Sequence, residues 1–542
     1  MRSRRLIALL AIAVATMSVT GATSALAGDN ESGFKTSKPA FLDGRSGWTT
    51  EAIISTGDRL PGGYVFEAIP DGISIGKVNG QGTADILVNH ELSLVPFPAT
   101  RQDAANSTVS QLRLNQHSAG VLKADYVIPQ SAGYQRFCSN FLVGTEQGFE
   151  RELLLTNEEA RDIVLRQADS WHQPTVALSE PGAEQAGVVV AYDIKSGAFK
   201  SIYGMGRHNH ENSVGIPGYG HPVVLSGDDT FDAPASQLYL YQAASGTAFW
   251  NDTGSLYAFK VDDPAINDYG DIIEAMDPVP GHFIPVPVAI ATGKINGRDV
   301  TASDFGYPNP PSAAIPNGPQ WVLEHWSNLN NVFQFIRIED TAYDRNNPRI
   351  TYMADTGEPR AKPDATTGRL RRDSTGGGPY MNGRIWKLTL GSNPLEGATL
   401  DILPGADFDA LGYNNPNAVH QPDNVETTTE GLYIQEDTGS HNAQSAAFPN
   451  ATNARVWRYD ISKGSLGVVA EVNQAVPGAP TLNRGSWESS GIVDASSIFG
   501  PGAFLLDVQA HLWDMDAGTG NDAPAVPKRE NGQLLLLRAP RS

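Results

Sequence analysis

Hydrophobic and polar positions along the chain fall in short blocks of roughly four to eight residues, bounded by Gly, Pro, Asn and Asp. This pattern is typical of short strands joined by turns, because the apolar positions of a helix recur every three to four residues instead. The clearest exception is Asn157–Gln167, where two early acids and two later arginines suit a helix. We therefore expect an all-β chain with little helix.

A loose repeat of one short apolar strand recurs six times along the chain. Each copy runs directly into acidic or polar residues, and in several copies a second strand with a central aromatic residue follows, as in Gln237–Tyr241 and Ala454–Tyr459. Blades of a β-propeller have this pattern, because an inner strand brings polar residues to the central channel and the next strand pairs with it. We therefore predict a six-bladed β-propeller with long insertions, whose inner strands end at Glu91, Glu158 and Glu159, Asp228 and Asp229, Asp355, Glu436 and Asp437, and His511.

The longest interval between these strand ends separates Asp228 from Asp355, and it is long enough to hide a seventh blade. The residues Tyr257–Gln320 within it are rich in Pro and Asn, which is typical of a surface loop. We therefore favour six blades with an insertion at this place. A pair of packed β-sandwiches is the alternative all-β architecture.

Composition agrees with this picture and excludes several classes of protein. The 542 residues include 55 Gly and 36 Pro, too many for a helical bundle, while 40% hydrophobic and 18% charged residues exclude a disordered chain. Asp and Glu total 60 against 39 Lys and Arg, which gives a net charge of −21. Such a chain lacks the basic surface that nucleic acid or anionic lipid requires, and it favours the binding of cations.

The first 27 residues have the organisation of an export signal. Arg2, Arg4 and Arg5 precede the apolar stretch Leu6–Val14, and Ala25-Leu26-Ala27 is a cleavage site of small residues. The apolar stretch is shorter than the roughly 20 residues that span a bilayer. The paired arginines also suit a twin-arginine signal, which exports folded proteins. We therefore expect residues 1–27 to be removed and 28–542 to form one propeller domain, secreted or periplasmic, monomeric and without a membrane span.

The acidic strand ends also predict a metal centre. A propeller brings them together at the channel mouth, where carboxylates without cations would repel one another. Hard oxygen donors favour Ca²⁺, and an added thiolate or imidazole favours a transition metal. Cys138 is the one cysteine, so the chain has no disulfide framework, and this residue is either a small buried side chain or a thiolate ligand. Any one acid, taken alone, equally suits a turn cap or a solvated surface.

Two Asp-Thr-Gly triplets, beginning at Asp355 and Asp437, do not indicate an aspartic protease. Gln435 and Glu436 precede the second triplet, where that motif needs apolar residues, and Glu358 follows the first, where it needs Ser or Thr. The sequence also contains no Gly-x-Ser-x-Gly, P-loop or His-Glu-x-x-His motif.

Short motifs follow one another in order over nearly the whole mature chain: Asn89-His90-Glu91; Cys138 with Gly144-Thr145; Leu155-Thr156-Asn157-Glu158-Glu159; Gly206-Arg207-His208-Asn209-His210-Glu211; Gly227-Asp228-Asp229; Gly254-Ser255-Leu256-Tyr257; Arg337-Ile338-Glu339-Asp340; Pro422-Asp423-Asn424; Glu488-Ser489-Ser490-Gly491; and Val508-Gln509-Ala510-His511. Each is weak alone, but in their number and order they resemble the PhoX-type alkaline phosphatases, a family of exported bacterial propellers. The sequence departs from the family pattern at Asn157, Ile338 and Leu512, which is typical of a divergent member.

This resemblance implies a six-bladed propeller that hydrolyses phosphate monoesters at a cluster of ferric iron and calcium in the channel mouth. It makes Cys138 an iron ligand, and it makes Arg207 and Arg337 candidates for holding the phosphate of a small-molecule ester. It makes Glu211, Asp228 and Glu339, and with them Glu158 and Glu488, candidate metal carboxylates. Glu91 and Glu159 are further metal candidates as acidic strand ends, and Asp423 is one because Pro422-Asp423-Asn424 is a turn that offers oxygen ligands.

Two other functions remain open on the sequence. One is a calcium-dependent propeller hydrolase of another ester, such as a lactone, in which Cys138 has no role. The other is a non-catalytic propeller that binds a ligand or an envelope partner and uses calcium for stability. The metal content of the purified protein distinguishes them, because iron together with calcium favours the phosphatase.

Overall fold

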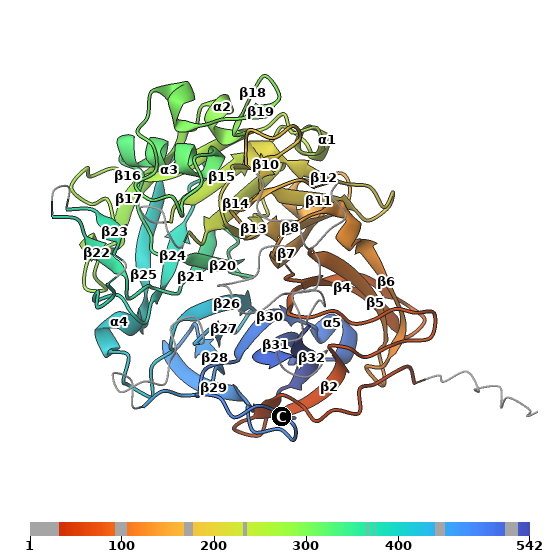
Figure 1. Ribbon diagram of the computed structural model, residues 1–542. Helices are drawn as coiled ribbons and strands as arrows, with labels where there is room; N and C mark the ends of the chain where they lie inside the picture. The colour runs from red at the N-terminus through yellow and green to blue at the C-terminus, as the bar shows by residue number, and fades with distance from the viewer. Residues whose placement is uncertain are drawn as a thin grey trace, which may run out of the picture. The chain divides into compact units, whose positions relative to one another are not determined.

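The computed structural model describes residues 32–92, 106–166, 177–230, 236–365, 368–373, 375–438, 450–514 and 529–541. It places them mainly in β-strands, and the strands form sheets around a common centre (Figure 1). The expectation of an all-β chain with a propeller-like arrangement is therefore confirmed, and the alternative of two packed sandwiches is not observed in the described residues. The predicted export signal at 1–27 lies outside these residues.

Four of the sheets are separate, antiparallel and built of four or five strands. The first two are β3 (Pro70–Asn79), β4 (Thr83–His90), β5 (Thr108–Asn115) and β6 (Val121–Ile128); and β7 (Phe137–Val143), β8 (Leu153–Glu158), β11 (Val189–Asp193) and β12 (Phe199–Ile202). The other two are β26 (Pro422–Thr427), β27 (Gly431–Glu436), β28 (Arg455–Asp460), β29 (Ser465–Val472) and β1 (Leu42–Gly44); and β30 (Glu488–Asp494), β31 (Ala503–Asp514), β32 (Glu530–Arg538) and β2 (Thr49–Ser55).

A fifth, nine-stranded sheet occupies the rest of the circle. Its order in space is β13 (His210–Gly215), β14 (Val223–Asp228), β15 (Leu238–Gln242), β16 (Ser255–Val261), β17 (Val279–Pro285), β25 (Ala398–Asp407), β24 (Arg384–Thr389), β21 (Ile350–Asp355) and β20 (Ile338–Tyr343). Strands β13 and β20, at the two ends of this order, pack against each other, so the sheet is nearly closed.

Helices and small ribbons lie in the connections between the strands. The helices are α1 (Gly246–Trp250), α2 (Val288–Ala291), α3 (Pro319–Leu329), α4 (Phe408–Leu411) and α5 (Ser496–Phe499). Single 3₁₀ turns lie at Gln130–Ala132, Thr145–Gln147, Tyr203–Met205, Tyr269–Asp271 and Ala302–Phe305. The ribbons pair β9 (Ile163–Val164) with β10 (Glu184–Gln185), β18 (Lys294–Ile295) with β19 (Arg298–Asp299), and β22 (Ala361–Pro363) with β23 (Leu370–Arg372). Within the described part of the chain, no helix has the length and apolar character needed to cross a membrane.

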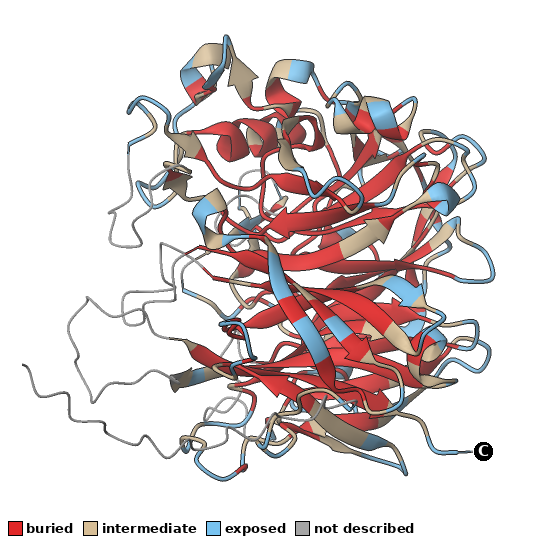
Figure 2. Ribbon diagram, turned by 90° about the vertical axis from the view of Figure 1, so that its right-hand side faces the viewer, coloured by how far each residue is buried: buried red, intermediate tan, exposed pale blue. Residues whose placement is uncertain are grey.

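Six strands lie innermost and form a closed ring. In order around the ring, β3, β7, β13, β20, β26 and β30 each pack against the next, and β30 packs against β3 (Figure 1). The apolar side chains are buried farther out, between neighbouring sheets, and Figure 2 shows buried residues along the strands and exposed ones mainly in the connections. The ring therefore leaves its polar side chains facing one central channel.

The same β-bulge recurs near the start of the inner strands. In β3, for example, Asp71 and Gly72 stand opposite Asn89 alone, because the pairing steps from Pro70 and His90 to Ile73 and Val88. Equivalent shifts occur in β7, β13, β20 and β26. A bulge bends its strand and re-aims the extra side chain. It therefore places the first residue of each bulge, which is Asp71, Cys138, Glu211, Glu339 or Asp423, at the channel.

The prediction of which strand of each sheet lies innermost is wrong by one strand. The apolar strands before Glu91, Glu158, Asp228, Asp355, Glu436 and His511 are β4, β8, β14, β21, β27 and β31, the second strands of the sheets. These strands are apolar because both of their faces are covered by neighbouring sheets. The innermost strands face the channel and are polar, as in the sequence His-Glu-Asn-Ser-Val-Gly of β13, so hydrophobic patterning does not reveal them. The pairing of β15, β24 and β28 with the apolar strands is confirmed.

The predicted helix at Asn157–Gln167 is also wrong. Asn157 and Glu158 end β8, and Ile163–Val164 form β9. Glu158 and Arg166 do interact, but as a tertiary ion pair and not along a helix. Arg166 binds both carboxylate oxygens of Glu158 at 2.7 and 2.8 Å. The charge pattern that suggested a helix therefore reflects a buried tertiary contact.

The segment Tyr257–Gln320 is more ordered than the predicted surface loop. It contains most of β16, all of β17, the helix α2 and the start of α3. Strand β17 pairs with β16 on one side and with β25 on the other, so it joins the two halves of the nine-stranded sheet. The described residues of this interval hold no separate seventh sheet of four strands.

Strands from near the N-terminus complete the two sheets that the C-terminal part of the chain forms. β1 pairs with β29, and β2 pairs with β32 over the register Thr49 with Arg538 to Ser55 with Gln533. The ring is therefore closed by backbone hydrogen bonds between strands that lie far apart in the sequence.

Candidate metal centre

Buried acids and the cysteine meet at one end of the central channel. Four groups of three side chains have ligand atoms within 4.8 Å of one another. Each group shares one member with the next, so together they form a continuous chain of donors. The groups are Asp71, Glu91 and Cys138; Cys138, Glu159 and Glu211; Glu211, Glu339 and Asp423; and Asp423, Asp437 and Glu488.

Each of the six inner strands contributes one donor to this chain. The bulges position five of them, and Glu488 is the first residue of β30. The remaining donors, Glu91, Glu159 and Asp437, each follow the last residue of a second strand, β4, β8 or β27. Of the acidic strand ends predicted to meet, only Glu91, Glu159 and Asp437 lie in this chain of donors, and the inner strands supply the larger part. Asp355 accepts hydrogen bonds from the backbone of Ile336 and Arg337, Glu436 binds Arg455, and His511 binds Glu530.

The electrostatic environment of the buried donors favours bound cations. Burial raises the pKa of Glu159, Glu211, Glu339 and Asp423 well above the usual range, and nearby carboxylates raise it further. Burial also raises the pKa of the Cys138 thiol, and the charge of Asp71 adds to the effect. These groups cannot all ionise together in a dry site unless positive charge neutralises them.

Unsatisfied oxygen atoms show that the donor set fits metal ions. Oδ1 of Asp71, Oε1 of Glu159 and Oε2 of Glu211 are buried and have no hydrogen-bond partner. The Cys138 thiol lies 3.3 Å from Oδ2 of Asp71. Buried polar atoms are normally paired, and carboxylate oxygens together with one sulfur are the donors that hard and borderline cations use.

A hydrogen-bonded layer supports the donors from below. The Ser139 hydroxyl donates to Oε1 of Glu211 at 2.9 Å, and Asn424 donates to Ser139 at 3.0 Å. Thr356 donates to Oε1 of Glu339 at 2.8 Å. Partners of this kind orient ligating carboxylates. Ser139, the second residue of the β7 bulge, therefore supports Glu211 of the neighbouring bulge, and Asn424 holds Ser139 in place.

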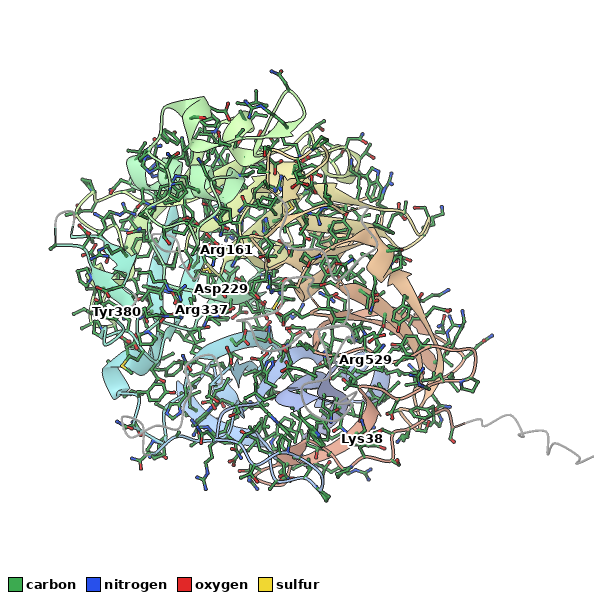
Figure 3. All side chains as sticks on the ribbon, in the orientation of Figure 1. Lys38, Arg161, Asp229, Arg337, Tyr380 and Arg529 are labelled. Carbon is green, nitrogen blue, oxygen red and sulfur yellow. The ribbon has the colours of Figure 1, made fainter. Side chains whose placement is uncertain are left out.

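Arg337 is a cation within the chain of donors. Its guanidinium binds both oxygens of Asp229 at 2.6 and 2.8 Å and Oε1 of Glu339 at 2.7 Å. Figure 3 shows Arg337 and Asp229 side by side at the centre of the ring, with Arg161 above them. Because the Arg337 side chain is only 6% exposed, its charge acts through a medium of low dielectric.

Arg207 does not reach the metal centre. It is fully buried, binds Asp299 at 3.3 Å and lies over the ring of Tyr203 at 5.1 Å. This arginine, proposed from the sequence as a phosphate ligand, lies in an ion-pair network of the insertion. Removal of one partner of such a buried ion pair strongly destabilises the folded protein, because the other charge is left unpaired.

Two of the predicted metal ligands, Glu158 and Asp228, lie outside the donor chain. Glu158 faces Arg166, and Asp228 accepts a hydrogen bond from Thr230 at 2.5 Å. Their sequence neighbours, Glu159 and Asp229, face the centre instead. Consecutive residues at a strand end point in opposite directions. When two acids are adjacent, one therefore faces the centre and the other faces away from it. All the other predicted ligands lie in the chain of donors: Glu91, Cys138, Glu159, Glu211, Glu339, Asp423 and Glu488.

Asp71 and Asp437 were not predicted as metal ligands from the sequence, although both lie in the chain of donors. Asp437 was visible as one of the acidic strand ends. Asp71 has a weaker signal, because Asp71-Gly72 is a bulge only in the folded sheet. Burial raises the pKa of Asp71 to about 6.

Removal of calcium is expected to lower the melting temperature by several degrees, and more at pH 8 than at pH 5. The pKa of Asp71 is about 6, and burial also raises the pKa of Asp423, so both lie above the value near 3.9 of an unfolded chain. The metal-free fold therefore keeps the full stability of these groups below about pH 4 and loses it as the pH rises through 6. Bound calcium would remove this loss, because the ionised carboxylates would then have a cationic partner.

Calorimetry of chelated and calcium-loaded protein at both pH values measures this effect. A chelation effect of the same size at pH 5 and pH 8 would contradict the assignment of the penalty to these carboxylates. A melting temperature that chelation leaves unchanged would show that calcium does not stabilise the fold.

Comparison with known proteins supports the fold. No protein-family model matches the sequence, and no curated protein matches it. Among solved structures, the chain is similar to PhoX from Pseudomonas fluorescens in complex with vanadate, a transition-state analogue, with a TM-score of 0.59 and 15% identity over 94% of this chain and 98% of that one. It also matches the NanB sialidase from Streptococcus pneumoniae (TM-score 0.35, 6% identity, 86% and 68% covered) and the polysaccharide lyase Uly1 (0.29, 8%, 86% and 77%), at TM-scores that carry no argument. The chain therefore has a PhoX-like fold.

Proposed function

We propose that this protein is an exported, metal-dependent phosphatase of the PhoX type that hydrolyses phosphate monoesters at the channel end. The observation that carries the proposal is the continuous chain of donors, with the single thiol among its members, inside a PhoX-like fold. The order of the sequence motifs agrees with it. In this proposal the nine-stranded sheet is two blades joined edge to edge through β17, so the ring of six inner strands corresponds to six blades.

The proposed ligands divide by their chemistry. Cys138 and the carboxylates beside it, Glu159 and Glu211, would hold ferric iron, while the all-oxygen group of Asp423, Asp437 and Glu488 would hold calcium. When bound, these ions supply Lewis acidity, which polarises a phosphoryl group and increases the acidity of an oxygen nucleophile.

The residues of the chain would position the substrate and control charge. A phosphate monoester is a dianion, which the net charge of −21 repels unless positive charge at the site reverses the local sign. Arg337 lies among the donors and would attract the phosphoryl oxygens, while Asp229 and Glu339 hold its guanidinium in place. The buried walls of the channel strengthen this attraction, because they exclude water.

One experiment tests the proposal directly. Purified protein is analysed for metals and assayed with a chromogenic phosphate monoester, before and after removal of metals and reloading with calcium and ferric iron. We expect iron and several calcium ions per chain and an activity that needs both. Calcium alone with hydrolysis of a lactone would favour the other ester hydrolase, and calcium without hydrolysis of either substrate would favour a binding propeller.

Export is a separate prediction. The mature protein is expected to begin near Gly28 and to leave the cytoplasm, because residues 1–27 have the organisation of a signal. Mass analysis of the exported protein checks the new N-terminus. Replacement of Arg4 and Arg5 by Lys should block export if the twin-arginine route is used. Exported protein that keeps residues 1–20 would contradict the prediction of cleavage.

A further inference from the structure

A second group of buried donors lies where α3 packs against the nine-stranded sheet. Asp228 ends β14, His208 lies two residues before β13, and Glu324 is in the second turn of α3. All three side chains are completely buried. None of them belongs to the donor groups of the metal centre.

Five polar atoms of these three residues have no hydrogen-bond partner. They are both ring nitrogens of His208, Oδ2 of Asp228 and both oxygens of Glu324. The neighbouring His210 differs, because its ring nitrogens lie 2.7 Å from the Ser226 hydroxyl and 3.2 Å from the carbonyl of Gly206. Buried polar atoms are rarely left unpaired, and so many in one place indicate a ligand that pairs them.

The three side chains surround one place in the fold. Nδ1 of His208 lies 3.7 Å from Oδ1 of Asp228, and the ring of Tyr239 stacks on His208 at 4.9 Å. Burial raises the pKa of Glu324 and the charge of Asp228 raises it further, while the nearby polar side chains of Thr230 and Gln320 lower it. Both carboxylates also act on the Tyr239 hydroxyl, whose pKa burial already raises.

The first turns of α3 are held against Asp228 by hydrogen bonds. Gln320, one turn before Glu324, donates to the Thr230 hydroxyl at 2.9 Å. Thr230 in turn donates to Oδ1 of Asp228 at 2.5 Å. Residues four apart lie on the same face of a helix, so Glu324 is presented on the same side of α3 as Gln320.

We propose that His208, Asp228 and Glu324 bind one further divalent cation, which fastens α3 to the nine-stranded sheet. One imidazole and two carboxylates suit Mn²⁺, Fe²⁺ or Zn²⁺ better than Ca²⁺, which prefers oxygen donors alone. The ligand atoms of His208 and Asp228 are already as close as two ligands of one ion. Glu324 lies farther out, since the three do not all fall within 4.8 Å of one another, and it turns toward Asp228 on binding. The site is structural and takes no part in ester hydrolysis.

Anomalous diffraction from crystals of the full chain grown with Mn²⁺ locates the ion. We expect an anomalous peak between His208 and Asp228, within reach of Glu324, and no such peak in crystals of Glu324→Gln. Peaks at the central donor chain report on the proposed phosphatase centre independently. Absence of the outer peak overturns the proposal, whatever the central donors show.

Hydrogen exchange of α3 gives a second readout in solution. In metal-stripped wild type, added Mn²⁺ is expected to slow exchange of the α3 amides about 10-fold or more, because the ion ties the helix to the sheet. Glu324→Gln and His208→Gln should show no such slowing, while the control Glu430→Gln, at a side chain 83% exposed, should behave as wild type. Equal slowing in both site variants overturns the proposal. The use of two variants guards against one that fails to fold.

Discussion

Replacement of Asp423 by Asn is expected to lower phosphatase turnover by more than about 100-fold while leaving the fold intact. Asp423 belongs to two neighbouring donor groups, one with Glu211 and Glu339 and one with Asp437 and Glu488. Asn keeps the shape of the side chain but removes the charge and one strong metal donor. Loss of this one residue therefore separates the last donor group from the others. Glu211→Gln, which interrupts the series of donors in the middle, should have a similar effect.

Glu426→Gln is the matched control. Glu426 lies on the same strand as Asp423 and is as well buried. It binds Arg345 at 2.8 Å and lines a cavity of about 730 Å³ at the other end of the channel. Turnover and bound metal are measured for all three variants, together with circular dichroism to check folding. Near-normal turnover in both Asp423→Asn and Glu211→Gln would return these acids to a structural role.

Replacement of Cys138 by Ser is expected to remove colour, iron and activity together. The thiol is buried between Asp71 and Glu211, and burial raises its pKa, so without a metal it would stay protonated and spectroscopically silent. Bound to ferric iron it becomes a thiolate, and charge transfer from sulfur to iron absorbs visible light. Because Cys138 is the one cysteine in the sequence, any such band is assigned to it without ambiguity.

The contrast between holo and metal-free wild type serves as the control for this prediction. Stripping the metals should bleach the band and leave a thiol that reacts with a thiol reagent only after unfolding. Cys138→Ser should then resemble stripped wild type in its spectrum. If Cys138 is only a core residue, the substitution costs about 1–3 kcal/mol for a buried hydroxyl and leaves turnover unchanged. A colourless, iron-free wild type with full phosphatase activity would instead support an enzyme that uses calcium alone.

Hydrophobic patterning predicted the second strand of each sheet and not the first. Strands such as β14 and β31 lie between two layers of side chains, and each begins with a buried apolar run, Val223–Leu225 or Ala503–Leu506, that is easy to see in the sequence. The inner strand β26 faces a polar channel, and its sequence Pro-Asp-Asn-Val-Glu-Thr resembles a loop. The polar residues that make the ring functional therefore also hide it from a search for apolar strands.

The structure places most of the metal ligands predicted from the sequence among the buried donors, but not Glu158 or Asp228. Cys138, Glu211 and Glu339 were assigned through motifs, and all three lie among the donors. At the ends of β8 and β14 the acids come in pairs, and sequence alone does not decide which member points inward, since one step along a strand reverses the side chain. Asp71 depends on a bulge, which is a property of two paired strands and leaves almost no trace in either one alone.

The pairing of β2 with β32 sets the order in which this protein can fold. A chain emerging from the ribosome releases Thr49–Ser55 early, but their partners at Glu530–Arg538 follow much later in the sequence. Until β31 and β32 have been made, this sheet lacks two of its four strands. Until β30 has been made, β3 also lacks the neighbour that closes the ring of inner strands. Completion of this sheet therefore waits for β32, and it carries the entropic cost of closing a long loop. A protein truncated before β32 is left with a last sheet that lacks this strand and with an unpaired edge on β2, which is the kind of edge that promotes aggregation.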